Sequence, residues 1–132
     1  MIAFDTNVLV RLLVRDDPDQ FGAAAARLDE ARDADEACYL SDIVLCETVW
    51  VLTSRYGAAR SDIQEALTRI VEDPRYVLDD PEGLVEALAA FRSGAAELSD
   101  FLISIRAKRR GARTTYTFDR KLRNDAGCTV IG

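Results

Sequence analysis

Ile2-Ala3-Phe4-Asp5-Thr6-Asn7-Val8-Leu9-Val10-Arg11-Leu12-Leu13 is the stretch of sequence that decides the fold class. Its first three residues are apolar and predict a short buried strand, whereas the apolar run from Val8 predicts a helix. The polar residues between them are suited to the amino-terminal cap of that helix. A strand that leads directly into a helix is the repeating unit of an α/β protein.

Strand and helix alternate along the rest of the chain. A strongly apolar helix, expected to be buried, is preceded by the capping residues Ser41 and Asp42 and closed by Gly57. This alternation predicts a mainly parallel sheet with helices on both faces. Strands are predicted at 37–40, 76–78, 114–118 and 128–131, helices at 20–32, 43–54, 61–71, 81–91 and 99–110, and a helical or turn segment at 119–125.

The bulk properties predict a single soluble domain that spans residues 1–132. The chain is 48% hydrophobic and 30% charged, which is ordinary for a globular protein. It has no apolar run long enough to cross a membrane, and its first residues lack the basic region of a signal peptide. Its three cysteines have no paired spacing, so we expect core thiols in a reducing cytoplasm rather than disulfides or a zinc site.

Charge is unevenly distributed. The net charge of −6 argues against a generic nucleic-acid binder, which needs a cationic surface. The segment from Arg106 to Arg123, the basic window, nevertheless contains only one acidic residue, Asp119. A solvated helix face and a surface that attracts nucleic acid explain this concentration of basic residues equally well. The eight basic residues of the window are Arg106, Lys108, Arg109, Arg110, Arg113, Arg120, Lys121 and Arg123.

Four acidic residues stand out in a chain that has no histidine: Asp5, Glu47, Asp100 and Asp119. Three of them have a structural explanation, because Asp5 is placed to cap a helix, Asp100 lies in a predicted first turn and Asp119 is placed for a turn. Glu47 is the hardest to explain structurally. It lies within an apolar helix that has no Lys or Arg between residues 41 and 54, and burial of an unpaired carboxylate is costly.

Taken together, these acids predict a metal site. Asp5 and Asp119 each follow a predicted strand, and ligands bind at the carboxyl edge of a parallel sheet. Several carboxylates at one edge repel one another unless a cation lies among them. Mg²⁺ and Mn²⁺ prefer such oxygen ligands.

Four segments in register resemble the PIN domain, most of all the VapC-type ribonuclease toxins: residues 2–9, 40–52, 98–103 and 117–122. The resemblance implies a PIN-like three-layer α/β/α fold with Mg²⁺ or Mn²⁺ held by Asp5, Glu47, Asp100 and Asp119. Thr6, Asn7, Ser41 and Thr117 match polar positions that orient the site. Glu97 matches a further acidic position where relatives usually have Asp, and Phe101 replaces a small residue, which is expected to narrow the cleft.

The resemblance also implies a function. The implied activity is that of a metal-dependent endoribonuclease, which acts as the toxin of a type II, VapBC-like toxin–antitoxin system. In the implied reaction, a metal-activated water attacks the RNA phosphate and leaves a 5′-phosphate and a 3′-hydroxyl. The basic window would attract the RNA. A cognate antitoxin and a second copy of the chain are the expected protein partners.

Three other classes of protein place acidic residues in a similar pattern or share the fold. A phosphoacceptor signalling domain needs an acidic pair after the first strand and a lysine after the last strand, and this chain has neither. A haloacid-dehalogenase-type phosphohydrolase needs a second aspartate at the position of Asn7. A catalytically silent PIN-like interaction module retains the fold, and a test of metal-dependent RNA cleavage separates it from the enzyme.

Overall fold

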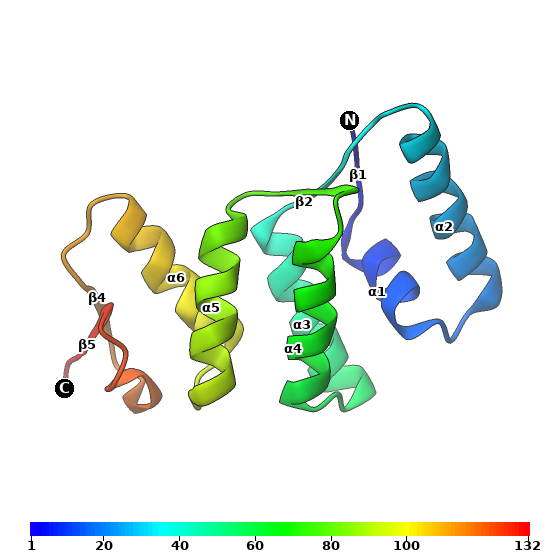
Figure 1. Ribbon diagram of the computed structural model, residues 1–132. Helices are drawn as coiled ribbons and strands as arrows, with labels where there is room; N and C mark the ends of the chain where they lie inside the picture. The colour runs from blue at the N-terminus through cyan, green and yellow to red at the C-terminus, as the bar shows by residue number, and fades with distance from the viewer. The chain divides into compact units, whose positions relative to one another are not determined.

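The computed structural model describes residues Met1–Gly132, which form two compact units, Met1–Asp79 and Asp80–Gly132. The first unit contains β1 (Ile2–Ala3), α1 (Thr6–Val14), α2 (Pro18–Asp33), β2 (Cys38–Leu40), α3 (Asp42–Tyr56), α4 (Arg60–Glu72) and β3 (Tyr76–Leu78) (Figure 1). The second unit contains α5 (Pro81–Ser93), α6 (Leu98–Arg109), β4 (Thr115–Thr117), the short 3₁₀ helix η1 (Arg120–Leu122) and β5 (Cys128–Val130).

Every strand pairing is parallel. In the first unit β2 lies between β1 and β3, with Ile2 opposite Cys38 and Cys38 opposite Tyr76. In the second unit β4 pairs with β5, and Thr115 lies opposite Cys128. Parallel neighbours need a crossover connection, which α1 and α2 provide between β1 and β2, and α3 and α4 provide between β2 and β3. The predicted α/β class with parallel strands is therefore confirmed.

Local sequence signals set the ends of the helices. The Ser41 hydroxyl accepts a hydrogen bond from the Val44 N–H (3.1 Å), and Gly57, at φ 62°, ends α3 in the left-handed conformation that glycine adopts without strain. Asp80 caps α5, and Pro81 follows it at the first helical position. The predicted boundaries at these residues are confirmed.

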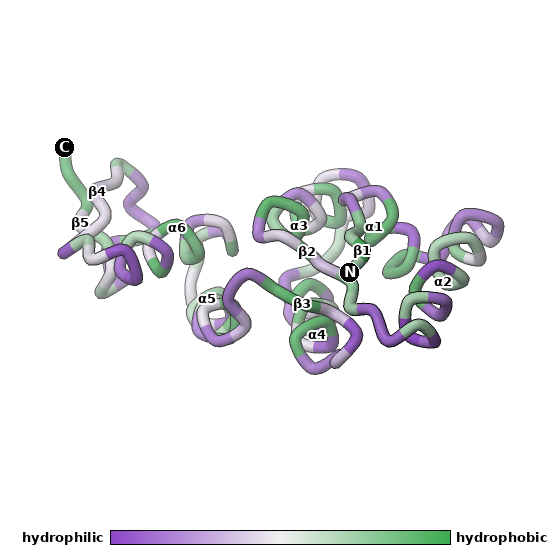
Figure 2. The backbone as a smooth tube through the Cα atoms, turned by 90° about the horizontal axis from the view of Figure 1, so that it is seen from above, coloured by the Kyte–Doolittle hydropathy of each residue, from purple (hydrophilic) through white to green (hydrophobic).

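The first unit buries one face of α3 rather than the whole helix. Leu45, Val49 and Leu52 are in the core, whereas Ile43 and Trp50 are 70% and 64% exposed. In Figure 2, which looks nearly along α3, much of its coil has the green of hydrophobic residues, with hydrophilic residues among them. Within this unit only one face of α3 is therefore covered, and burial of the rest of the helix stays a prediction. A largely apolar sequence carries little information about which face packs.

The second unit has its own apolar core. Leu84 and Phe91 of α5 and Leu98 of α6 are almost fully buried, and α5 and α6 pack against each other. None of the helices in the protein combines the length and the continuous apolar sequence that crossing a bilayer requires.

Candidate metal site

Asp5 lies directly after β1 and caps α1. Its backbone is extended (φ −87°, ψ 177°), and its Oδ1 accepts a hydrogen bond from the Val8 N–H at 3.2 Å. The predicted capping role is therefore confirmed. The side chain is exposed, and capping uses only one of its two carboxylate oxygens.

Glu47 lies on the exposed face of α3, so the cost of burying its charge does not arise within this unit. The Thr6 hydroxyl donates a hydrogen bond to Glu47 Oε2 at 3.0 Å. Since Thr6 is the first residue of α1 and the neighbour of Asp5, this bond draws Glu47 to the start of α1. Two predicted acids that are far apart in sequence thus come to one end of the first sheet.

Asp100 and Asp119 belong to the second unit. Asp100 is in the first turn of α6 and accepts a hydrogen bond from the Glu97 N–H through Oδ2 (3.0 Å). Asp119 follows β4, and its Oδ1 accepts a hydrogen bond from the Lys121 N–H (2.9 Å). The Asp119 N–H in turn donates to the Thr117 hydroxyl at 3.0 Å. Both carboxylates are half-buried, and α6, which carries Asp100, packs on β4.

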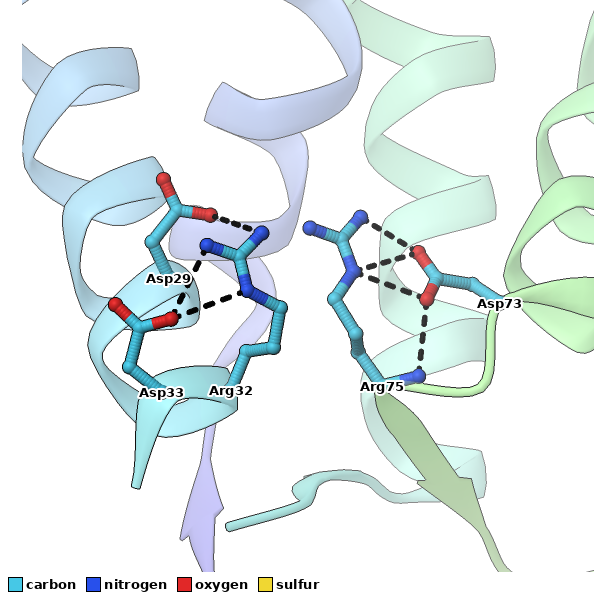
Figure 3. Close-up of polar contacts among 5 residues, drawn as sticks. All are labelled: Asp29, Arg32, Asp33, Asp73 and Arg75. Atoms are coloured by element: carbon cyan, nitrogen blue, oxygen red, sulfur yellow. Dashed lines mark hydrogen bonds and ion pairs between the residues drawn. The ribbon is translucent and has the colours of Figure 1, made fainter. Parts of the chain in front are cut away.

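The four acids share one property: none of them forms a salt bridge. Several other carboxylates in the protein form ion pairs with arginine. Arg75 donates to Asp73 through Nε and Nη2, the latter at 2.7 Å (Figure 3), and this hydrogen bonding lowers the pKa of Asp73. The same view shows Arg32 between Asp29 and Asp33, with contacts of 3.4 and 3.3 Å.

The donor set fits a hard divalent ion. Asp5, Glu47, Asp100 and Asp119 each keep a carboxylate oxygen that no donor in the protein occupies, and carboxylate oxygens are the ligands that Mg²⁺ and Mn²⁺ prefer. Two of the acids are in the first unit and two in the second, and within neither unit do three acidic or cysteine side chains converge on one point. Their joint role as metal ligands stays a prediction.

The residues predicted to support the site differ in what they do. Thr6 and Thr117 make the hydrogen bonds described above, and Ser41 uses its hydroxyl to cap α3. Asn7 and Glu97 have exposed side chains. Phe101, expected to narrow a cleft, is instead buried, because its ring packs against Gly94 at the end of α5.

Asp125 is a residue that the sequence analysis missed. Its Oδ1 accepts a hydrogen bond from the Gly127 N–H (3.0 Å), and its Oδ2 lies 3.3 Å from the Ser104 hydroxyl and 3.7 Å from the Cys128 thiol. Burial, followed by the negative charge of Asp125, raises the pKa of Cys128. The one available signal was Ser104, a polar residue on α6 that is only 4% exposed.

Two cations of the basic window have structural roles. The Arg106 guanidinium lies 2.7 Å from Asp80, and Arg109 also forms an ion pair with this carboxylate. The Gly83 N–H, followed by the charges of Arg109 and Arg106, lowers the pKa of Asp80. The cations of the window without a carboxylate partner are Lys108, Arg110, Arg113, Arg120, Lys121 and Arg123.

The comparisons with known proteins agree with this architecture. The model of the PIN domain family matches residues 2–127, nearly the whole chain, and the chain therefore belongs to the PIN domain family. Six helices and parallel strand pairing are consistent with the three-layer α/β/α fold expected for it. Membership indicates a nuclease-type function. Searches of curated proteins and of solved structures found no match.

Proposed function

We propose that this protein is a Mg²⁺- or Mn²⁺-dependent endoribonuclease and the toxin component of a type II, VapBC-like toxin–antitoxin system. Asp5, Glu47, Asp100 and Asp119 are the proposed ligands. The observation that supports the proposal is that a chain of the PIN family has four carboxylates, each with an oxygen that accepts no hydrogen bond, and that none of them forms an ion pair within its own unit.

The bound ion would lower the pKa of a coordinated water and neutralise charge on the phosphate undergoing attack. The chain's own residues hold the ligands in place. The Thr6 hydroxyl fixes one oxygen of Glu47, and backbone N–H groups fix one oxygen each of Asp5, Asp100 and Asp119. Because the chain has no histidine, imidazole takes no part in proton transfer.

RNA is the proposed substrate. The six cations of the basic window without a carboxylate partner are available to phosphate oxygens, and they would offset the repulsion between an acidic site and a polyanion. Arg106 and Arg109 are less available, because Asp80 holds both.

A cognate antitoxin is the proposed protein partner. A pocket of about 470 Å³ lies among α1, α2, α4 and β3, and its apolar lining includes Leu12, Phe21, Leu28 and Ile70. Its lining also includes the charged residues Arg15, Asp29, Arg69, Asp73 and Arg75. A pocket of this size with both apolar and charged groups supports a docking place for a partner segment in the first unit. A homodimer is proposed through the exposed apolar residues of α3, and the three free cysteines support a reducing, cytoplasmic setting.

Metal-dependent cleavage of a labelled RNA tests the enzyme directly. The native chain with Mg²⁺ or Mn²⁺ is expected to cut the RNA and leave 5′-phosphate ends, and EDTA is expected to stop the reaction until excess Mg²⁺ is added back. Cleavage that continues in EDTA would exclude the metal mechanism. A chain that binds RNA but never cuts it would instead be a silent PIN-like module.

A further inference from the structure

We propose that Asp125 is a positioning residue for the metal site, one that sets the place of Asp100 relative to Asp119 without itself binding the metal. The proposal rests on the proposed function, because it concerns two of the proposed ligands. Both ligands and Asp125 lie in the second unit, so the whole argument stays within one compact body.

Asp125 connects two elements through both of its carboxylate oxygens. Oδ1 accepts from the Gly127 N–H at 3.0 Å, which folds the turn before β5, and Oδ2 receives the Ser104 hydroxyl of α6 at 3.3 Å. That hydroxyl also lies 3.2 Å from the Phe101 carbonyl oxygen, so its hydrogen is shared between two acceptors. The contact is part-buried and Ser104 is 4% exposed, so water has little access to replace it.

The turn and the helix are in close contact at this point. A Cβ atom added at Gly127 would lie 3.0 Å from the Ser104 hydroxyl oxygen and 3.3 Å from its Cβ. Glycine therefore lets the backbone of the turn approach α6, and the Asp125 carboxylate holds it there. Both observations place the turn before β5 against Ser104 of α6.

Both partners of this contact are connected through a few residues to a proposed ligand, Ser104 to Asp100 and Asp125 to Asp119. Ser104 follows Asp100 by one turn of α6, on the same side of the helix. On the other side, the Asp125 N–H donates to the Leu122 carbonyl at 3.0 Å, and Leu122, which is 4% exposed, ends the 3₁₀ helix that Asp119 caps. Loss of the Asp125 carboxylate would leave α6 free to shift against that 3₁₀ helix.

The test measures Mn²⁺ binding, by the electron paramagnetic resonance signal of free Mn²⁺, without RNA. Asp125→Asn removes the charge and weakens the Ser104 contact, and we expect it to raise the Kd for Mn²⁺ about tenfold, as for other groups that orient metal ligands. Ser104→Ala, a small change at a core position, should raise Kd comparably. The double variant should bind Mn²⁺ no more weakly than the weaker of the two single variants, because both substitutions act on the same contact between Ser104 and Asp125.

Asp73→Asn is the matched control. Asp73 also accepts a hydrogen bond from the N–H two residues ahead, that of Arg75 at 3.0 Å, but it is in the first unit. The Asp73→Asn variant should lower the midpoint of thermal unfolding at least as much as Asp125→Asn does. Its Kd for Mn²⁺ should stay within about twofold of the native value. RNA binding in EDTA should be equal in all variants.

The outcomes separate the two claims. If the native chain binds Mn²⁺ and both Asp125→Asn and Ser104→Ala bind it within twofold of the native Kd, the positioning role is wrong and the proposed function stands. Additive losses in the double variant would also overturn it. If the native chain binds no Mn²⁺ and cuts no RNA, the proposed function fails, and the positioning role fails with it.

Discussion

Replacement of Asp100 by Asn is expected to lower metal-dependent RNA cleavage at least roughly 100-fold, equivalent to about 2.7 kcal/mol of transition-state stabilisation. The substitution removes a charged ligand but retains an oxygen that accepts the Glu97 N–H, so the first turn of α6 is preserved. Initial rates on a labelled RNA at saturating Mg²⁺ measure the effect, and circular dichroism verifies the fold.

Asp62→Asn provides the control for this substitution. Asp62 occupies the same position in α4 that Asp100 occupies in α6, and it accepts a hydrogen bond from the Ala59 N–H at 3.1 Å. It is outside the proposed site, so the variant should cleave RNA at the native rate. Equal losses in the two variants would mean that Asp100 serves the helix rather than the chemistry.

Replacement of Asp80 by Ala is expected to lower the free energy of unfolding by roughly 2–3 kcal/mol. Loss of the N-cap of α5 accounts for about 1 kcal/mol. The remainder arises because Arg106, whose side chain is only 29% exposed, loses the carboxylate that neutralises it. Urea unfolding, followed by circular dichroism, gives the value.

Asp17→Ala isolates the contribution of the ion pairs. Asp17 also caps a helix, α2, directly before a proline, and accepts from the Gln20 N–H at 3.1 Å, but no arginine pairs with it. Its loss should therefore cost only about 1 kcal/mol. If Asp80→Ala costs no more than Asp17→Ala, then Arg106 and Arg109 contribute nothing measurable to stability.

The stabilisation by Asp80 should depend on pH. Its pKa in the folded protein is lowered, chiefly by the Gly83 N–H and then by Arg109 and Arg106, relative to an unfolded value of about 3.9. Its contribution is therefore complete above the unfolded pKa and is lost as the pH falls through the folded pKa. The difference in unfolding free energy between the native protein and the Asp80→Ala variant should be largest at neutral pH. It should become smaller below a pH of about 4.

The parts of the fold that depend on local chemistry were predictable from the sequence. Ser41, Gly57 and Pro81 each favour a helix end through interactions with their immediate neighbours, so reading a few residues located them. The strand that ends before Asp119 was equally clear, because its residues are β-branched and aromatic.

The interactions that join distant segments were not predictable in the same way. The Thr6–Glu47 hydrogen bond spans 41 positions and the Asp125–Ser104 contact spans 21, and no local pattern specifies either partner. The ion pair between Arg109 and Asp80 also joins distant segments. It gives Arg109 a structural role that the directly adjacent basic residues lack, although the basic window looks uniform in sequence. Which face of α3 is buried within the first unit likewise depends on packing rather than on composition.

The central claim is that Asp5, Glu47, Asp100 and Asp119 are ligands of a divalent metal ion, and Mn²⁺ binding to single variants tests it most directly. Titration of the native chain and of Asp5→Asn, Glu47→Gln, Asp100→Asn and Asp119→Asn, without RNA, reports the Kd of each. We expect every variant to bind Mn²⁺ at least about tenfold more weakly than the native chain, because each loses a charged oxygen ligand. Native Mn²⁺ affinity in all four variants would contradict the claim that these residues bind the metal.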